Sequence, residues 1–465
     1  MDFITSAINS FFQFKAYVML PIIVLLIAII IRMNIREALL SVLKLAAGFA
    51  GIFIAFEFFI ENINPAVKAL AEIRNLDLPI LDVGWPPLAA ITWASPVAHL
   101  SIPLIIAINI IMVWTNMVKT IYIDIWNYWH FALVGALIFS LNDNLVIALI
   151  ATGLIAVYTI KLSDWTAPEV ERELGIKGLS VSPLSSVGML PYAVGVNWLF
   201  AHIPGLKKLN YNPHKLGEDK QSVFSEPMVI GIIVGLLLGI SAGYSFKLTL
   251  ELSVHIAAVM FILPKCGSLI GEGMGNVSEK LRDQIQKRFP KKTGLNVALD
   301  AGAVMHHKSI LTTGLILMPI SVFIALILPG NKTLPLGDLP SLISQVAVIV
   351  LICRGNVIRS VVAGIPVIIG YLLIATKLAP MITNLAHDAG ASFPADTQIT
   401  AFTDGGNPVR FWVLELFKGN WIAFAIIPVV GVLFYISYRN YRHSLTENTL
   451  NAQLQEAENI NAESL

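Results

Sequence analysis

Long apolar runs without charged residues recur along this chain of 465 residues, and they limit the folds that it can adopt. Residues 16–31 and 311–328 are two examples. Only 13% of the residues are charged, whereas ordinary soluble domains carry about a quarter. Membrane β-barrels alternate apolar and polar residues over roughly 10-residue strands, but these runs are continuous, as in membrane helices. The sequence therefore predicts an all-α integral membrane protein.

The apolar runs predict about eleven membrane-spanning helices. Several runs are close to the lower length limit of about 17 residues. The predicted spans lie near residues 16–31, 41–60, 97–115, 125–141, 145–160, 228–243, 246–264, 309–328, 340–353, 360–378 and 421–437.

The Lys and Arg residues between the spans predict the orientation, because cytoplasmic loops of membrane proteins carry an excess of both. With an odd number of crossings, all the basic loops lie on one side of the membrane. This arrangement places the N-terminus outside and the C-terminus in the cytoplasm. The basic loop residues include Arg32, Arg36, Lys119, Lys161, Lys177, Arg282, Arg288, Arg354, Arg359, Arg439 and Arg442.

Four stretches are too polar or too broken to span a membrane, yet too apolar for ordinary loops. We predict re-entrant hairpins or interfacial helices there, since irregular backbone is tolerated at membrane depth only where protein or a water-filled cavity satisfies it. The polar, acidic end of the chain is expected to be a frayed cytoplasmic tail. The four stretches are Leu78–Ser95, Gly178–His202, Gly294–Lys308 and Met381–Trp412, and the tail is 444–465.

Two of these stretches contain the same short pattern: Leu81–Gly84 reads LDVG and Leu299–Gly302 reads LDAG. Each pattern follows a pair of predicted spans, and the two breaks lie on opposite sides of the membrane. These are the features of an inverted repeat with its site at the repeat interface; the alternative is a coincidence between two glycine turns. The membrane domain is predicted over 1–443, with halves at about 1–165 and 222–443 joined by 166–221.

The first break is a candidate sugar or polyol site. Asp82, Gly84 and Trp85 lie close to a second indole, that of Trp93. A carboxylate accepts hydrogen bonds from hydroxyl groups, and an aromatic face covers apolar C–H groups. The alternative is an interfacial aromatic belt with a turn aspartate.

Asp124, Asn127 and His130 form a second candidate group, because their spacing places them on one face of a helix. The alternatives are a helix cap for the aspartate and a hydrogen bond within the helix core for the histidine.

Ser182, Ser185 and Asp300 complete the candidates. The two serines lie in a hydroxyl-rich bend, and they either bind a polyol or satisfy unwound backbone. Asp300 is the acid of the second break. The sequence contains no HExxH pattern and no paired Cys and His spacing, so we predict no metal site.

Several classes of function are excluded. The net charge of +1 does not indicate a nucleic-acid partner, and two cysteines, Cys266 and Cys353, cannot build a disulfide framework. We find no Walker A pattern, no set of Ser, His and Asp for catalysis and no cofactor motif. The chain is therefore expected to move a solute rather than to catalyse a reaction. Gly231, Gly235, Gly239 and Gly243 recur every four residues, which predicts close helix packing within the fold or at a dimer seam.

Taken together, these motifs resemble the galactitol-type enzyme IIC of the bacterial phosphoenolpyruvate-dependent sugar phosphotransferase system. The resemblance covers nearly the whole chain and is more distant for the ascorbate permeases of the same system. It is carried by Val18–Pro21, Leu81–Pro86, Thr92–Ser95, Asp124–His130, Lys161–Trp165, Glu226–Pro227, Pro329–Asn331, Gly337–Leu339 and Arg354–Asn356.

The resemblance implies a homodimer of eleven-span protomers that works by an elevator-like motion of a mobile core domain. It implies a polyol substrate, galactitol first, and phosphorylation by enzymes IIB and IIA as separate chains. In the ascorbate branch the substrate-contacting stretches correspond to the candidate segments above, and Asp82 and Asp300 are the positions carried over most directly. The alternative is an ion-coupled secondary transporter whose acids carry protons.

Overall fold

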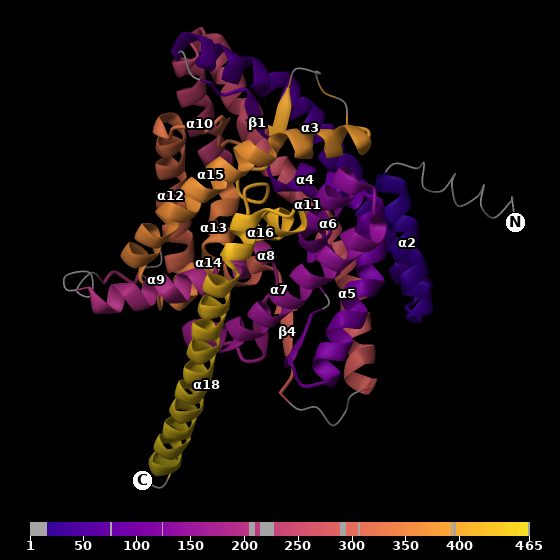
Figure 1. Ribbon diagram of the computed structural model, residues 1–465, viewed down its shortest axis with the longest axis vertical. Helices are drawn as coiled ribbons and strands as arrows, with labels where there is room; N and C mark the ends of the chain where they lie inside the picture. Colours follow the sequence, from indigo (N-terminus) through magenta and orange to yellow (C-terminus); the bar gives the residue numbers. More distant parts are fainter. Residues whose placement is uncertain are drawn as a thin grey trace, which may run out of the picture.

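The computed structural model describes residues 16–74, 77–122, 124–203, 210–213, 227–288, 294–305, 307–391, 393 and 397–463. Helices dominate it (Figure 1). In the first part of the chain they are α2 (Ala16–Ile30), α3 (Ile35–Arg74), α4 (Trp85–Trp93), α5 (Pro96–Trp114), η1 (Ile125–Tyr128), α6 (Trp129–Asn142), α7 (Leu145–Leu174), α8 (Leu184–Val187) and α9 (Leu190–His202). In the second part they are α10 (Pro227–Ser241), α11 (Phe246–Arg288), η4 (Ala301–Val304), α12 (Lys308–Ile327), η5 (Leu339–Ser341), α13 (Leu342–Gln345), α14 (Ala347–Ile352), α15 (Val357–Asp388), α16 (Pro408–Phe417), α17 (Trp421–Ala425) and α18 (Ile427–Glu463).

The helical membrane class predicted from the apolar runs is confirmed. Among the described residues, 8 helices are long and apolar enough to cross a membrane, and two shorter apolar helices accompany them. Leu184–His202 is one of the eight, although the sequence reading placed this segment among the broken stretches. The total of eleven crossings stays a prediction.

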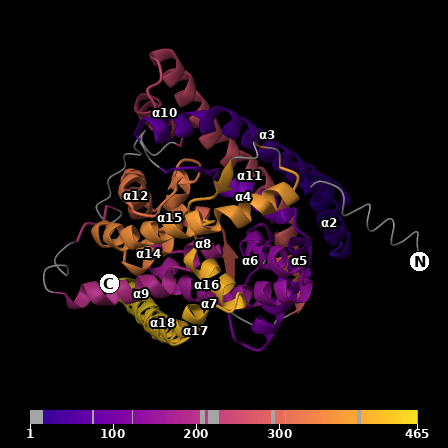
Figure 2. The same cartoon turned by 45° about the horizontal axis from the view of Figure 1, so that its top comes forward.

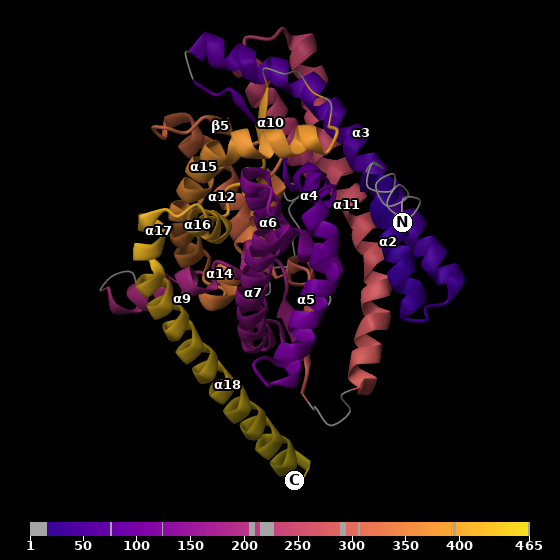
Figure 3. The same cartoon turned by 45° about the vertical axis from the view of Figure 1, so that its right-hand side comes forward.

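Helices α2, α3, α10 and α11 form one side of the molecule (Figures 2 and 3). Helix α11 packs along both α3 and α10. A Cβ atom at Gly231 would lie 2.5 Å from the Cα atom of Ala257, and one at Gly239 would lie 2.9 Å from the side chain of Thr249. The glycine stripe is therefore a packing motif within the fold, as one of the two predicted alternatives states. Gly243 is the exception, because it follows the end of α10 with a φ angle of 70°.

Two small parallel sheets lie between the helices, and the sequence reading did not predict them. One sheet has the order β5-β1-β6 and the other β2-β4-β3. In the first sheet the central strand comes from the first half of the chain and both of its neighbours from the second half. In the other sheet the central strand comes from the second half, β2 from the first half and β3 from the segment that joins the halves. The strands are β1 (Ile80–Asp82), β2 (Thr120–Ile121), β3 (Leu179–Val181), β4 (Asn296–Leu299), β5 (Thr333–Leu334) and β6 (Gln398–Thr400).

The two LDxG patterns occupy matching places in these sheets. Asp82 ends the central strand β1, and Asp300 directly follows the central strand β4. In Figure 1 the two central strands lie at different heights along the long axis of the molecule. The strand pairing satisfies backbone groups in the broken segments, which is the condition for irregular backbone inside a membrane. The inverted repeat itself stays a prediction.

The described part of the predicted tail, residues 444–463, is helical instead of frayed. Helix α18 continues to Glu463 and projects from the body on the side opposite to α2 (Figure 3). The carboxylate of Glu169 in α7 accepts hydrogen bonds from Asn440 Nδ2 (2.9 Å) and Ser444 Oγ (2.7 Å). Because these two residues continue the helix beyond its apolar part, their anchoring explains why the sequence-based expectation of a frayed tail was wrong.

Candidate substrate site

The carboxyl ends of the three strands in the sheet β2-β4-β3 bring four predicted site residues together. Asp124 follows β2 and precedes η1, Ser182 follows β3, and Asp300 follows β4. The Asn127 side chain donates hydrogen bonds to Asp124 Oδ2 (2.7 Å), Asp300 Oδ2 (2.9 Å) and Ser182 Oγ (3.3 Å). Ser182 Oγ also donates to Asp124 Oδ2 at 2.6 Å. We call Asp124, Asn127, Ser182 and Asp300 the open cluster.

The open cluster is rich in hydrogen-bond acceptors and reaches the surface. Asp300 is exposed, Asp124 is half-buried, and Asn127 and Ser182 are buried. Asp300 also accepts a bond from the backbone N–H of Gly302 (2.8 Å). An ionised carboxylate can only accept hydrogen bonds, and two carboxylates here share one side-chain amide. The cluster can therefore accept several hydroxyl hydrogens from a ligand.

Asp82 lies in a different environment, at the end of the central strand of the sheet β5-β1-β6. Its side chain is fully buried. The carboxylate accepts bonds from the backbone N–H groups of Leu336 (2.8 Å), Phe402 (2.9 Å), Asp338 (3.1 Å) and Gly84 (3.2 Å). Asp82 therefore joins the segments that follow all three strands, and the structure does not bring it into one site with Asp300.

Asp338 is the second carboxylate of this buried group, and the sequence reading did not select it as a site residue. It accepts bonds from Trp85 N (3.0 Å), Ser341 Oγ (2.8 Å) and Thr403 N (3.0 Å), and from the Thr403 hydroxyl. We call Asp82, Asp338 and Thr403 the closed cluster. Asp338 precedes η5 as Asp124 precedes η1, so the two clusters are built on matching positions of the two halves.

Gly84 and Trp85 serve packing in this conformation. The φ angle of Gly84 is 81°, and a Cβ atom there would lie 2.7 Å from the carbonyl oxygen of Gly337. The indole of Trp85 lies against Gly267 of α11 and makes an edge contact with Trp126, with ring centroids 6.2 Å apart. A role of these two residues in substrate binding stays a prediction.

His130 and Ser185 lie close in sequence to members of the open cluster. Both side chains are buried, and they contact other residues. His130 Nδ1 lies 3.2 Å from Asp404 Oδ1 and 3.2 Å from Arg410 Nη2. Ser185 is part of the short helix α8 and is 4% exposed. The sequence reading missed Asp404 and Arg410, although it marked Met381–Trp412 as a broken stretch, and that break was the available signal.

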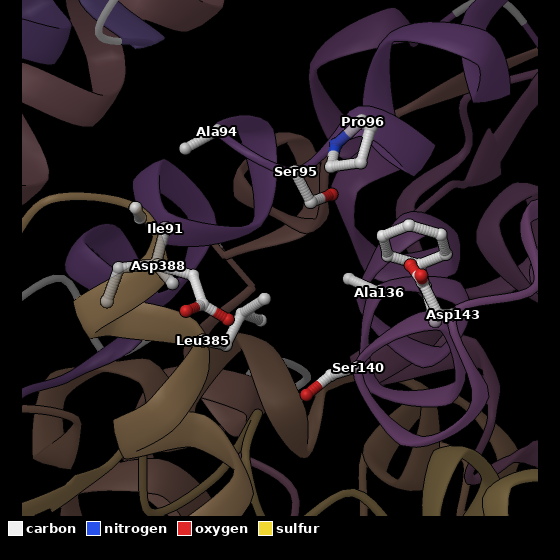
Figure 4. Close-up of a pocket in the computed structure, with 11 residues that line it drawn as sticks. Ile91, Ala94, Ser95, Pro96, Ala136, Ser140, Asp143, Leu385 and Asp388 are labelled. Carbon is white, nitrogen blue, oxygen red and sulfur yellow. The ribbon is translucent and has the colours of Figure 1, made fainter. Parts of the chain in front are cut away.

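A cavity of about 400 Å³ lies elsewhere, between the ends of α4, α6 and α15. Ser95, Ser140, Asp143 and Asp388 supply its polar groups (Figure 4). None of the residues predicted as substrate contacts is among those that line it. The cavity is therefore a second, separate location to be tested for the substrate.

Comparison with known proteins identifies the family. The family model of the PTS system sugar-specific permease component (EIIC-GAT) matches residues 10–396. The PTS system galactitol-specific EIIC component of Escherichia coli (strain K12) is 32% identical over 417 residues, which cover 90% of this chain and 91% of that protein. A putative permease IIC component of the same strain is 30% identical over 416 residues, 90% of this chain and 94% of that protein. The chain therefore belongs to the family of PTS sugar-specific permease components, the translocating rather than the phosphoryl-transferring subunits of that system.

Proposed function

We propose that this permease imports a polyol, galactitol first, across the bacterial inner membrane, and that the open cluster holds the substrate. The observation that carries the proposal is the meeting of Asp124, Asn127, Ser182 and Asp300 at the carboxyl ends of three strands. The relative whose name specifies galactitol supports the choice of substrate. In this scheme Asp124 and Asp300 accept hydroxyl hydrogens, and Asn127 donates to a hydroxyl oxygen.

The family implies separate IIA and IIB components, and the geometry is consistent with phosphorylation by such a partner. A phosphoryl group adds about −1.5 to −2 charge at neutral pH. Two carboxylates in the open cluster repel that charge, so phosphorylation would expel the product from the site that bound the sugar. The reaction itself would take place on enzyme IIB.

The conformation described here corresponds, in our proposal, to a site open toward the cytoplasm. The strands β2 and β3 begin just after Lys119 and Lys177, in loops whose basic residues indicate the cytoplasmic side. Asp300 at the carboxyl end of β4 is exposed, while Asp82 in the other sheet is fully buried. The N-out and C-in orientation, the eleven crossings, the homodimer and the elevator-like motion belong to the same proposal.

An ion-coupled transporter is the alternative. The observation that favours it is the pair of neighbouring carboxylates in each cluster, since carboxylates can carry protons. Uptake into vesicles separates the two mechanisms. We expect radiolabelled galactitol to accumulate only as its phosphate, and only when phosphoenolpyruvate and the soluble components are present. Accumulation of unmodified galactitol on an imposed proton gradient alone would overturn it. A direct binding screen of pentitols and hexitols on the purified protein identifies the substrate.

A further inference from the structure

Three titratable side chains meet inside the protein beside the substrate site. Arg410 in the first turn of α16 is 1% exposed, Asp404 is 2% exposed and His130 is 3% exposed. Arg410 Nη2 lies 3.6 Å from Asp404 Oδ1, and Arg410 Nε donates to the backbone carbonyl of His130 at 3.3 Å. A second nitrogen of the guanidinium donates to the backbone carbonyl of Asp404. The guanidinium therefore connects the start of α6 with the segment between β6 and α16.

The ring of His130 is held whatever its protonation state. If Nδ1 carries no proton, it accepts a hydrogen bond from Arg410 Nη2, which lies at 3.2 Å. If the ring is protonated and charged, it forms an ion pair with Asp404, whose Oδ1 atom also lies 3.2 Å from Nδ1. The ring further stacks on Trp129, with centroids 4.0 Å apart. Both the backbone and the side chain of His130 are thus fixed from the other half of the chain.

His130 and Asn127 lie three residues apart on one continuous helical segment, formed by η1 and the first turn of α6. Residues at this spacing are neighbours on the helix surface, so a shift of one shifts the other. Asn127 is the residue that contacts both carboxylates of the open cluster. We infer that Asp404 and Arg410 are positioning residues, which fix Asn127 in the substrate site by holding His130.

The segment that carries Asp404 and Arg410 is itself rigidly built. A Cβ atom at Gly405 would lie 2.5 Å from the carbonyl oxygen of Ala401, so this turn accepts only glycine without a shift. Asn407 caps α16 by accepting a bond from the backbone N–H of Arg410 (3.0 Å). The backbone N–H of Asp404 points to Asp338 Oδ2 in the closed cluster, at 3.4 Å. The positioning residues therefore link the closed cluster with the open one.

The test combines amide hydrogen exchange with a double-mutant cycle of galactitol binding. Both are needed because this inference rests on the proposed function. The variants are Arg410→Gln, Arg410→Lys and Asp404→Asn, each with and without Asn127→Ala. The control is Glu415→Gln on the same helix, whose carboxylate bonds Lys418 and Asn420 instead of His130. Galactitol is the ligand used for binding, and exchange is followed in peptides that cover residues 124–130.

We expect Arg410→Gln and Asp404→Asn to speed exchange over residues 124–130 and to weaken galactitol binding by roughly tenfold, with the control unchanged in both. Arg410→Lys should recover part of the loss, because it keeps the charge but not the planar fork. In the Asn127→Ala background the same substitutions should weaken binding little further. Unchanged exchange over 124–130, or an equal loss of affinity in both backgrounds, would overturn the inference. If Asn127→Ala binds galactitol normally, the proposed site fails, and the exchange result alone decides whether Arg410 holds this segment.

Discussion

Asp82 and Asp300 occupy matching positions after the central strands of two parallel sheets, but only Asp300 has an exposed side chain. Asp82 accepts four backbone hydrogen bonds. Asp300 faces the amide of Asn127 and the surface. In one sheet the aspartate of this pattern thus satisfies buried backbone groups, and in the other sheet it remains available as a hydrogen-bond acceptor. We therefore expect the two aspartates to respond differently to the same substitution.

Asp300→Asn should weaken galactitol binding with little effect on stability. The substitution removes a charged acceptor at an exposed position, and hydrogen bonds to charged groups are worth about 2 kcal/mol, or roughly 30-fold in affinity. Isothermal titration calorimetry on the purified protein measures the change. Asp388→Asn is the matched control, because Asp388 is an exposed carboxylate that lines the separate cavity. A loss of affinity in the control alone would show that the substrate binds in that cavity instead of the open cluster.

Asp82→Asn should instead destabilise the protein. An asparagine amide presents only one oxygen to the four backbone N–H groups that the carboxylate now satisfies, and each unsatisfied buried donor costs about 1–3 kcal/mol. The expected result is a lower midpoint of thermal unfolding in detergent. Asp77→Asn serves as the control, since Asp77 makes an exposed ion pair with Lys332 and should change the midpoint little. An unchanged unfolding midpoint together with a loss of galactitol binding would show instead that Asp82 contacts the substrate directly.

Gly84→Ala should be more damaging than Gly175→Ala. Both glycines have positive φ angles, but Gly84 (φ 81°, ψ 170°) lies in a region that is essentially restricted to glycine, whereas Gly175 (φ 71°, ψ 11°) lies in the left-handed helical region, where alanine costs about 1 kcal/mol. Only at Gly84 does the added Cβ also meet the Gly337 carbonyl, at 2.7 Å, whereas nothing lies within 4 Å of a Cβ at Gly175. The difference between the two unfolding midpoints measures this contact together with the greater backbone strain at Gly84. Equal midpoints would show that the segments at Gly84 and Gly337 can move apart without loss of stability.

Glu169→Ala should release the end of α18. Glu169 is buried and is bonded by Asn440 and Ser444, and Arg172 Nη1 lies 2.5 Å from its carboxylate. The substitution removes the acceptor of Asn440 and of the buried Ser444 hydroxyl, at about 1–3 kcal/mol for each unsatisfied buried group, while Arg172 keeps Glu173 as a partner. Limited proteolysis should then cut the chain after residue 440 more quickly. Glu171→Ala, at a half-buried position two residues away, is the control, and equal cleavage of the two variants would contradict the assigned anchor.

The sequence predicts the helices and the open cluster better than the strands. Long apolar runs identify helices because a membrane helix needs about 20 such residues. Strands such as β1 and β4 are too short to show a two-residue period, and their partners lie far away in the chain. The spacing of Asp124 and Asn127 was informative because both lie on one local helical turn. Arg410 carried no such signal, because its partner His130 is 280 residues away.

The phosphorylated polyol should bind more weakly than the free polyol, and Asp300→Asn should reduce that difference. At about 4 Å, like charges near a protein surface repel each other by roughly 4 kcal/mol at an effective dielectric constant of 20. Asp124 and Asp300, bridged by one Asn127 amide, would both face the added phosphate. Titration calorimetry with galactitol and its phosphate at low and high salt measures the effect, since salt weakens the repulsion of an exposed carboxylate. Equal affinity for the two ligands in the unsubstituted protein would show that these carboxylates do not drive product release.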